Sequence, residues 1–386
     1  MTTNYAYAAG FNETDDTPSS YSSSAYEEDA PKPISWKIAV GLVLGVISLV
    51  TVLGNALVIA AFATDWKLRG NRGNWFILNL SVSDFFIGLM VIPVNSLWVV
   101  NGSWPLGEYF CKVWIVIDYT ASYMSVLTMV MISLDRYWLV TKKLAYRDFV
   151  TRTKVLLMVG TAWLLCVVFY VVVTFAWTLL TGEQNIDYSD DCEMESVYNL
   201  PFNIALILLE FVIPLFVIIC LNWRIYSIIK LRSTQFIGSK PTASAAPSRG
   251  KNTVAPMPTT ASNSAKPPPT TTAAPDSPGR DKKEFQKHHR AAFTLAILIG
   301  IFIICWLPYY TTVILGTFCD ECVPDSVWEF TNYLLWCNST LNPFLYAVLH
   351  ARYRDNFIRL LGLKRFYQRW AASRLNDLND TESTNT

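Results

Sequence analysis

The chain has 386 residues, of which 52% are hydrophobic, 14% are aromatic and only 16% are charged, and its formal net charge is +1. This charge is too small to indicate a nucleic-acid partner. Several apolar runs exceed the roughly 18 residues that mark a membrane-spanning helix, because about 20 residues are needed to cross the hydrocarbon core. The composition therefore excludes a soluble domain of any size and predicts a polytopic membrane protein.

Seven apolar runs occur along the chain, at 38–63, 74–98, 111–140, 155–180, 199–229, 291–317 and 327–349. Runs of this length must be helices rather than strands, since a helix satisfies its backbone hydrogen bonds internally. After the last run, the segment HARYRDNFIRLL alternates basic and apolar residues at helical spacing, which is typical of a helix lying on a membrane surface. The predicted fold class is an all-α membrane protein, a seven-transmembrane bundle with a short amphipathic eighth helix.

Composition also predicts where the bundle is interrupted. Residues 233–289 are rich in Pro, Ser, Thr, Ala and Gly up to about 281, and such a segment buries too little apolar area to offset its ordering entropy. The expected divisions are a disordered extracellular N-terminus (1–37), spans one to five (38–232), a disordered cytoplasmic loop (233–289), spans six and seven (290–350), and the eighth helix with a cytoplasmic tail (351–386).

The distribution of charge predicts the orientation. The segment before the first span is acidic, whereas the loops near 64–73 and 142–152 and the tail carry clustered Lys and Arg. The positive-inside rule places the N-terminus outside the cell and the C-terminus in the cytoplasm of a multi-pass plasma-membrane protein. Asn12 and Asn101 begin glycosylation sequons on the predicted outside.

Four of the eight cysteines fall on the predicted outside, where disulfides persist. The expected pairs are Cys111–Cys192, which ties the third span to the loop before the fifth, and Cys319–Cys322. A structural disulfide is favoured over a redox or zinc-binding thiol pair for the second of these, because it lies in a short outer loop.

Charged side chains within spans are costly and indicate function. Asp84, Asp118, Arg136 and Glu210 are such residues. Asp118 lies about 10 Å below the outer end of the third span and Arg136 about 27 Å deeper, at 1.5 Å per residue. One helix thus carries an anionic site near its outer end and a cationic site at its inner end.

Ordered motifs across all seven spans carry a family resemblance. They are Gly54-Asn55, the run LNLSVSD at Leu78–Asp84, Asp135-Arg136-Tyr137, Trp163, Pro214, Cys305-Trp306-Leu307-Pro308 and Asn342-Pro343-Phe344-Leu345-Tyr346. Together they resemble the rhodopsin-like (class A) G-protein-coupled receptors, specifically the aminergic group. The resemblance implies a receptor rather than an enzyme, with a heterotrimeric G protein, arrestin and receptor kinases as partners alongside the lipid membrane.

Within that family, Asp118 occupies the position that resembles the amine-binding aspartate. A ligand ammonium would supply the partner that a buried carboxylate needs, and aromatic rings at this depth can attract a cation. The implied ligand-binding residues are Asp118, Tyr119, Glu210, Trp306, Tyr309, Tyr310, Tyr333 and Trp336. Packing alone would explain some of these rings.

The fifth span bears on which amine is bound. Leu206 and Ile207 replace the serines of catecholamine receptors, and the segment LLEFVIP, which contains Glu210, is similar to the inhibitory-coupled histamine receptors. A ligand with a cation at one end and a polar ring at the other, such as histamine, would relieve the repulsion between two carboxylates. The alternative is that Glu210 pairs only with a neighbour. The segment DYTAS after Ile117 is closer to muscarinic receptors, so acetylcholine or another monoamine stays open.

The resemblance also implies two further sets of residues. Asp84, Ser125, Asn338 and Asn342 match the family's allosteric sodium site, with a water-filled polar cluster as the alternative, and no other cofactor is expected. Asp135, Arg136, Tyr137 and Tyr346 match its G-protein switch. An ion-coupled transporter would show inverted repeats, and none is evident. A retinal photoreceptor would need a lysine in 327–349, which contains none.

Overall fold

The computed structural model describes residues 33–142, 145–238, 278–319 and 322–363, with side chains left out of the description at 147, 232–238 and 278–292. Over these ranges the secondary structure is helical and includes no strand. The helices are α1 (Ile34–Thr64), α2 (Trp66–Gly70), α3 (Gly73–Phe86), η1 (Ile87–Val91), α4 (Ile92–Asn101), α5 (Gly107–Lys142), α6 (Tyr146–Phe149), α7 (Arg152–Thr181), η3 (Glu195–Tyr198), α8 (Leu200–Ile207), η4 (Leu208–Val212), α9 (Ile213–Gly238), α10 (Pro278–Phe318), α11 (Asp325–Leu349) and α12 (Ala351–Leu360).

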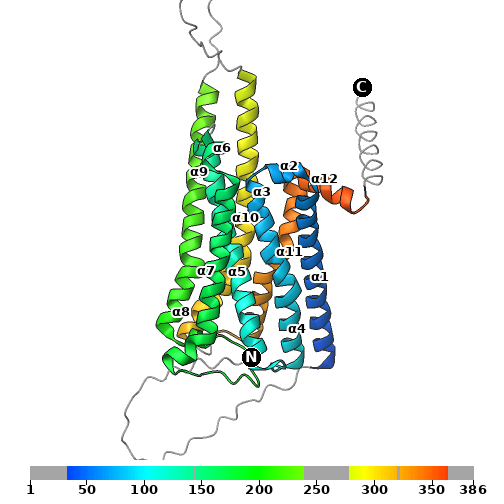
Figure 1. Cartoon of the computed structure of the whole chain (residues 1–386), viewed down its shortest axis with the longest axis vertical. Helices are drawn as coiled ribbons and strands as arrows, with labels where there is room; N and C mark the ends of the chain where they lie inside the picture. The colour runs from blue at the N-terminus through cyan, green and yellow to red at the C-terminus, as the bar shows by residue number, and fades with distance from the viewer. Residues whose placement is uncertain (1–32, 143–144, 239–277, 320–321, 364–386) are drawn as a thin grey trace, which may run out of the picture.

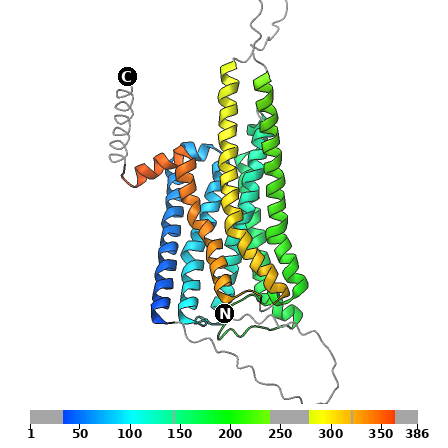
Figure 2. The ribbon, with the colours of Figure 1, turned by 180° about the vertical axis from the view of Figure 1, so that it is seen from behind.

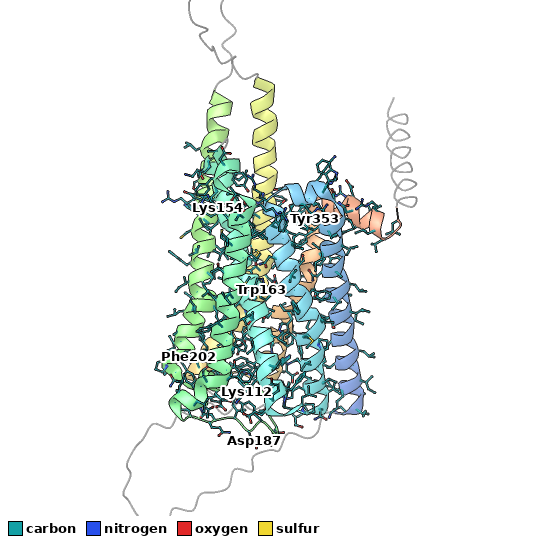
Figure 3. All side chains as sticks on the ribbon, viewed as in Figure 1. Lys112, Lys154, Trp163, Asp187, Phe202 and Tyr353 are labelled. Carbon is teal, nitrogen blue, oxygen red and sulfur yellow. A yellow bond between two sulfur atoms is a disulfide. The ribbon has the colours of Figure 1, made fainter. Side chains whose placement is uncertain are left out.

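The long helices lie side by side along one axis, and α9 and α10 project beyond the others at one end (Figures 1 and 2). We call that end the arginine end, because Arg136 lies in the last turns of α5 there. The opposite end, which holds the Cys111–Cys192 bridge, is the disulfide end. In Figure 3, Lys112 and Asp187 mark the disulfide end, and Lys154 and Tyr353 mark the arginine end.

Six of the described helical segments are long and apolar enough to cross a membrane: Ile34–Thr64, Gly73–Asn101, Gly107–Lys142, Arg152–Thr181, Leu200–Leu231 and Phe293–Phe318. The seventh predicted span corresponds to α11, which packs against α1, α3 and α10. Asp325, Glu329 and several asparagines make α11 more polar than the other spans. The observed architecture is the predicted all-α membrane bundle.

The predicted disordered loop is too wide at both ends. The helix α9 continues to Gly238 and α10 already begins at Pro278, so both enter the range 233–289. The apolar run ends before the helix does, because Lys, Arg, Glu and Gln are good helix formers that can extend a helix into water. Residues 239–277 lie outside the described ranges. The first span likewise begins earlier than predicted, at Ile34 directly after Pro33.

Two of the sequence motifs form contacts between spans. A Cβ atom on Gly54 would lie 2.9 Å from Cγ of Pro343, so glycine is required where α1 meets α11. The neighbouring Asn55 donates from Nδ2 to the Ser339 carbonyl at 3.1 Å, across the same contact. These bonds hold the first and seventh spans together near the middle of the bundle.

A second set of bonds joins three spans through Asn79. Trp163 Nε1 on α7 donates to Asn79 Oδ1 at 2.8 Å, and Asn79 Nδ2 donates to Thr128 Oγ1 on α5 at 2.7 Å. Figure 3 labels Trp163 midway along the bundle. Because both ends of the amide are used, Asn79 fixes α3 against α5 and α7.

The predicted amphipathic eighth helix is α12, whose Tyr353 and Phe357 are buried while Arg352 and Arg359 are exposed. Asp65, which follows α1, anchors it: Arg352 donates to its carboxylate at 2.5 and 2.9 Å, and Asn356 Nδ2 donates at 2.7 Å. The bonds from Arg352 hold the pKa of the Asp65 carboxyl well below its usual range.

Candidate functional site

A cavity of about 680 Å³ opens at the disulfide end of the bundle. Its described lining comes from α4, α5, η4, α10, α11 and the loop before η3. The lining residues are Asn95, Trp98, Trp114, Ile115, Asp118, Tyr119, Ser122, Tyr123, Cys192, Glu193, Glu210, Trp306, Tyr309, Tyr310, Asn332 and Leu335. We call it the inner cavity. Three of these side chains are carboxylates, and the described lining contains no Lys, Arg or His.

Asp118 points into the inner cavity from α5. Its Oδ1 accepts one hydrogen bond, at 3.1 Å from Ser122 Oγ, one helical turn further along. The side chain of Trp336 lies beside the same carboxylate. A carboxylate has about four acceptor positions, so Asp118 retains capacity for a ligand cation. Ser122 is the last letter of DYTAS, and the structure gives it a role that the sequence left unassigned.

Glu210 lines the same cavity from the fifth span. It lies on η4, a turn of π-helix that widens the fifth span just before Pro214, and such turns often occur at functional sites. Tyr170 donates to its Oε1 at 2.6 Å and Tyr310 donates to its Oε2 at 3.1 Å. Glu210 therefore has hydrogen-bonding neighbours, as the alternative prediction expected. These neighbours are neutral phenols, and Glu210 still lines the cavity.

Glu193 is a third carboxylate, and the sequence interpretation missed it. It follows Cys192 directly, and its Oε1 accepts from Tyr119 at 3.2 Å and from the Met194 backbone N–H at 2.9 Å. Burial raises the pKa of its carboxyl group. The signal that could have found it is its place next to a cysteine that the Cys111 bridge holds against α5.

Most of the predicted aromatic residues gather at this site. Trp306, Tyr309 and Tyr310 line the inner cavity, with Tyr310 stacked on Phe211 at a centroid distance of 4.3 Å. Tyr333 instead lines a second cavity nearer the end of the bundle, and Trp336 is only 2% exposed, behind the inner cavity beside Asp118. Tyr170 and Tyr123 join the site without having been predicted.

Three of the residues proposed for a sodium site meet deeper in the bundle, and no described contact joins Asn338 to them. Ser125 Oγ donates to Asp84 Oδ1 at 3.2 Å, and Asn342 Nδ2 donates to Asp84 Oδ2 at 2.8 Å. Asn338 is buried on the same helix as Asn342. Asp84 is fully buried, and the described part of the chain gives it no ion pair.

At the arginine end, Arg136 Nε lies 3.8 Å from Asp135 Oδ2, and the Tyr146 hydroxyl donates to Asp135 Oδ1. A Cβ atom on Gly73 would lie 2.9 Å from Asp135 Oδ2 and 3.0 Å from Arg136 Nη2, so the pair rests on bare backbone of α3. Tyr137 is half-buried next in the chain. Tyr346 is fully buried and packs against the rings of His350 and Tyr353.

Comparison with known proteins agrees with this architecture. Residues 54–346 match the family described as "7 transmembrane receptor (rhodopsin family)". The chain belongs to this rhodopsin-like receptor family. It is 28% identical to the muscarinic acetylcholine receptor M1 of Macaca mulatta over 428 residues, covering 88% of this chain and 93% of that protein. A D(5)-like dopamine receptor of Takifugu rubripes is 29% identical over 350 residues, covering 88% of this chain and 71% of the relative.

Membership makes the chain a receptor rather than an enzyme, and a multi-pass protein of the plasma membrane. It also implies a small-molecule ligand and coupling to a G protein. The chain is also 29% identical to a D(1B) dopamine receptor of Rattus norvegicus over 364 residues, covering 87% of this chain and 72% of that protein.

Both predicted disulfides are present in the receptor. Cys111 and Cys192 have Cα atoms 5.6 Å apart and join α5 to the loop that carries Glu193, and Cys319 is bonded to Cys322. Asn101, at the end of α4, is exposed and its Nδ2 donates to Ser103. Asn12 lies outside the described residues.

Proposed function

We propose that this receptor binds a small biogenic amine, histamine, in the inner cavity and signals through an inhibitory-class G protein. The observation that carries the proposal is a cavity lined by two carboxylates from different spans, Asp118 on α5 and Glu210 on η4, with no basic side chain in its described lining. A ligand ammonium would pair with Asp118, and the far end of the ligand would meet Glu210.

The hydrogen bonds at Glu210 favour histamine over acetylcholine. An ionised carboxylate only accepts hydrogen bonds, so the far end of the ligand must be a donor. The imidazole of histamine carries N–H groups, whereas acetylcholine carries no donor. The muscarinic and dopamine relatives support an amine in general, and they keep acetylcholine or another monoamine as the alternative.

The fifth span bears on the dopamine-like alternative. Leu206 and Ile207 line a side pocket next to Glu210 and contribute only alkyl groups. A catechol would find no hydroxyl partner on these two residues, although its own hydroxyls could donate to Glu210. Histamine uses the same glutamate without needing a further polar partner on α8.

Competition binding on the wild-type receptor and on Glu210→Gln tests the proposal. The Gln variant keeps the size of the side chain and loses its charge, and we expect histamine affinity to fall about tenfold, which corresponds to about 1.4 kcal/mol. Acetylcholine should compete weakly and equally on both. Glu108→Gln, at the same end but outside the cavity lining, is the matched control. Histamine affinity unchanged in Glu210→Gln would remove Glu210 from the site.

The remaining expectations belong to the same proposal. The disulfide end would face the extracellular side, with Asn12 and Asn101 glycosylated, and the arginine end would receive the G protein, arrestin and receptor kinases. Asp84, Ser125, Asn338 and Asn342 would hold a sodium ion through oxygen atoms, which suit a hard cation. The ion would supply the positive charge that buried Asp84 needs.

A further inference from the structure

Glu193 stands at the boundary between two cavities. Beyond the inner cavity, nearer the disulfide end, lies an outer cavity of about 780 Å³. The described residues that line both are Asn95, Trp98, Glu193, Tyr309 and Asn332. Glu193 is the charged member of this shared set, so a solute passing from one cavity to the other passes its carboxylate.

The position of the Glu193 carboxylate is fixed from two sides. The Cys111–Cys192 bridge holds the preceding residue against α5. Tyr119, also on α5, donates to its Oε1 at 3.2 Å, and the Met194 N–H donates to the same atom. Oε1 is thus engaged by the protein, and no described hydrogen bond involves Oε2.

Carboxylates follow one another along this path. Asp191 and Glu329 line the outer cavity, Glu193 stands at the boundary, and Asp118 lies inside. Asp118 and Glu193 line the same inner cavity. The described linings of both cavities contain no Lys, Arg or His. A cation therefore meets a favourable charge at each step, and such linings raise association rates.

We propose that Glu193 is an intermediate binding point on the ligand's entry path. Its carboxylate holds the ligand's ammonium at the boundary between the two cavities before the ammonium moves to Asp118. The inference rests on the proposed cationic ligand, and it concerns the rate of entry rather than the final contacts. The bound ammonium sits at Asp118 and the ligand leaves by the path it entered, so removing the charge of Glu193 should slow association and dissociation by similar factors and leave the affinity nearly unchanged.

The test is the binding kinetics of radiolabelled histamine on membranes carrying the full-length receptor. Glu193→Gln retains an oxygen that accepts from Tyr119 and Met194, and we expect its association and dissociation rate constants each to fall about tenfold, with an equilibrium affinity within about twofold of wild type. Its association rate should also depend less on salt. Asp190→Asn, on the same loop, exposed and outside both described linings, is the matched control and should retain the wild-type rates.

Glu193→Asp keeps the charge and should recover most of the association rate, which separates loss of charge from misfolding. Equal association rates in Glu193→Gln and wild type would overturn the inference, and so would a loss of affinity carried by faster dissociation. If the wild type binds acetylcholine and not histamine, the proposed ligand fails, and the same rate constants measured with acetylcholine decide the role of Glu193.

Discussion

The buried carboxylates at the two ends of the bundle differ in whether a cationic side chain lies beside them. At the arginine end, Asp135 lies 3.8 Å from Arg136 and Asp65 lies 2.5 Å from Arg352. At the disulfide end, Asp118, Glu193 and Glu210 line one cavity and accept hydrogen bonds from hydroxyl groups and a backbone N–H. The first group has cations supplied by the chain, whereas the second group has none among the described residues that line its cavity.

This difference separates two uses of charge within one fold. A carboxylate with its own arginine stabilises one arrangement of the helices, since breaking a buried pair leaves an uncompensated charge. A carboxylate that faces a cavity without a cation is costly until a ligand supplies one. Under the proposed function, the disulfide end binds the cationic ligand, and the arginine end holds a conformation that binding can change.

A lysine placed next to Asp118 should strongly weaken ligand binding. In Ser122→Lys the ammonium would lie one turn from Asp118, close enough to pair with it. We expect histamine affinity to fall about 100-fold or more, equivalent to about 3 kcal/mol. Radioligand competition measures the effect, and Ser122→Gln, of similar size without charge, is the control. Equal losses in the Lys and Gln variants would mean that bulk, and not charge, blocks the site.

Weakening the pair at the other end should release the resting state. Tyr146→Phe removes the hydroxyl that donates to Asp135. A hydrogen bond to a charged group contributes about 1.5 kcal/mol or more, so its loss should raise basal G-protein activation about tenfold. Nucleotide exchange without ligand measures it, with Tyr109→Phe, an exposed tyrosine at the disulfide end, as control. Basal exchange equal in both variants would show that Tyr146 does not restrain Arg136.

The anchor of α12 should contribute a small, pH-dependent stability. Because the pKa of Asp65 is lowered in the fold, its contribution is fully present above about pH 4, the ordinary range for aspartate, and is lost as the pH falls through the lower folded value. We expect Asp65→Asn to lower the thermal midpoint by about 2 °C at pH 7. Asp355→Asn, exposed on the same helix, should not. A gap that widened in acid would contradict the assigned sign.

Much of this arrangement could be predicted from the sequence, because the signals are local. Apolar run length gives the spans, and a carboxylate inside a run, such as Asp118 or Glu210, marks the site. The topology of the cysteines gives both disulfides. The ends of α9 and α10 were misplaced because charged helix formers continue both helices beyond their apolar runs.

The missed residues depend on contacts distant in sequence. Glu193 belongs to a loop and enters the site only because the Cys111–Cys192 bridge folds that loop over the cavity. Tyr170, 40 residues before Glu210, lies on α7 and donates to Glu210 from a different span. Tyr333 shows the reverse: the sequence predicted it near the depth of Asp118, but its place on α11 directs it to the outer cavity.

The central claim is that Asp118 binds the cationic group of the ligand. A thermodynamic cycle tests it directly, with histamine and a neutral analogue that carries a hydroxyl in place of the ammonium, each on wild type and on Asp118→Asn. We expect the wild type to prefer histamine by about 100-fold and the variant by less than about threefold, because the preference comes from one charge pair. An equal preference for histamine in both receptors would contradict the account.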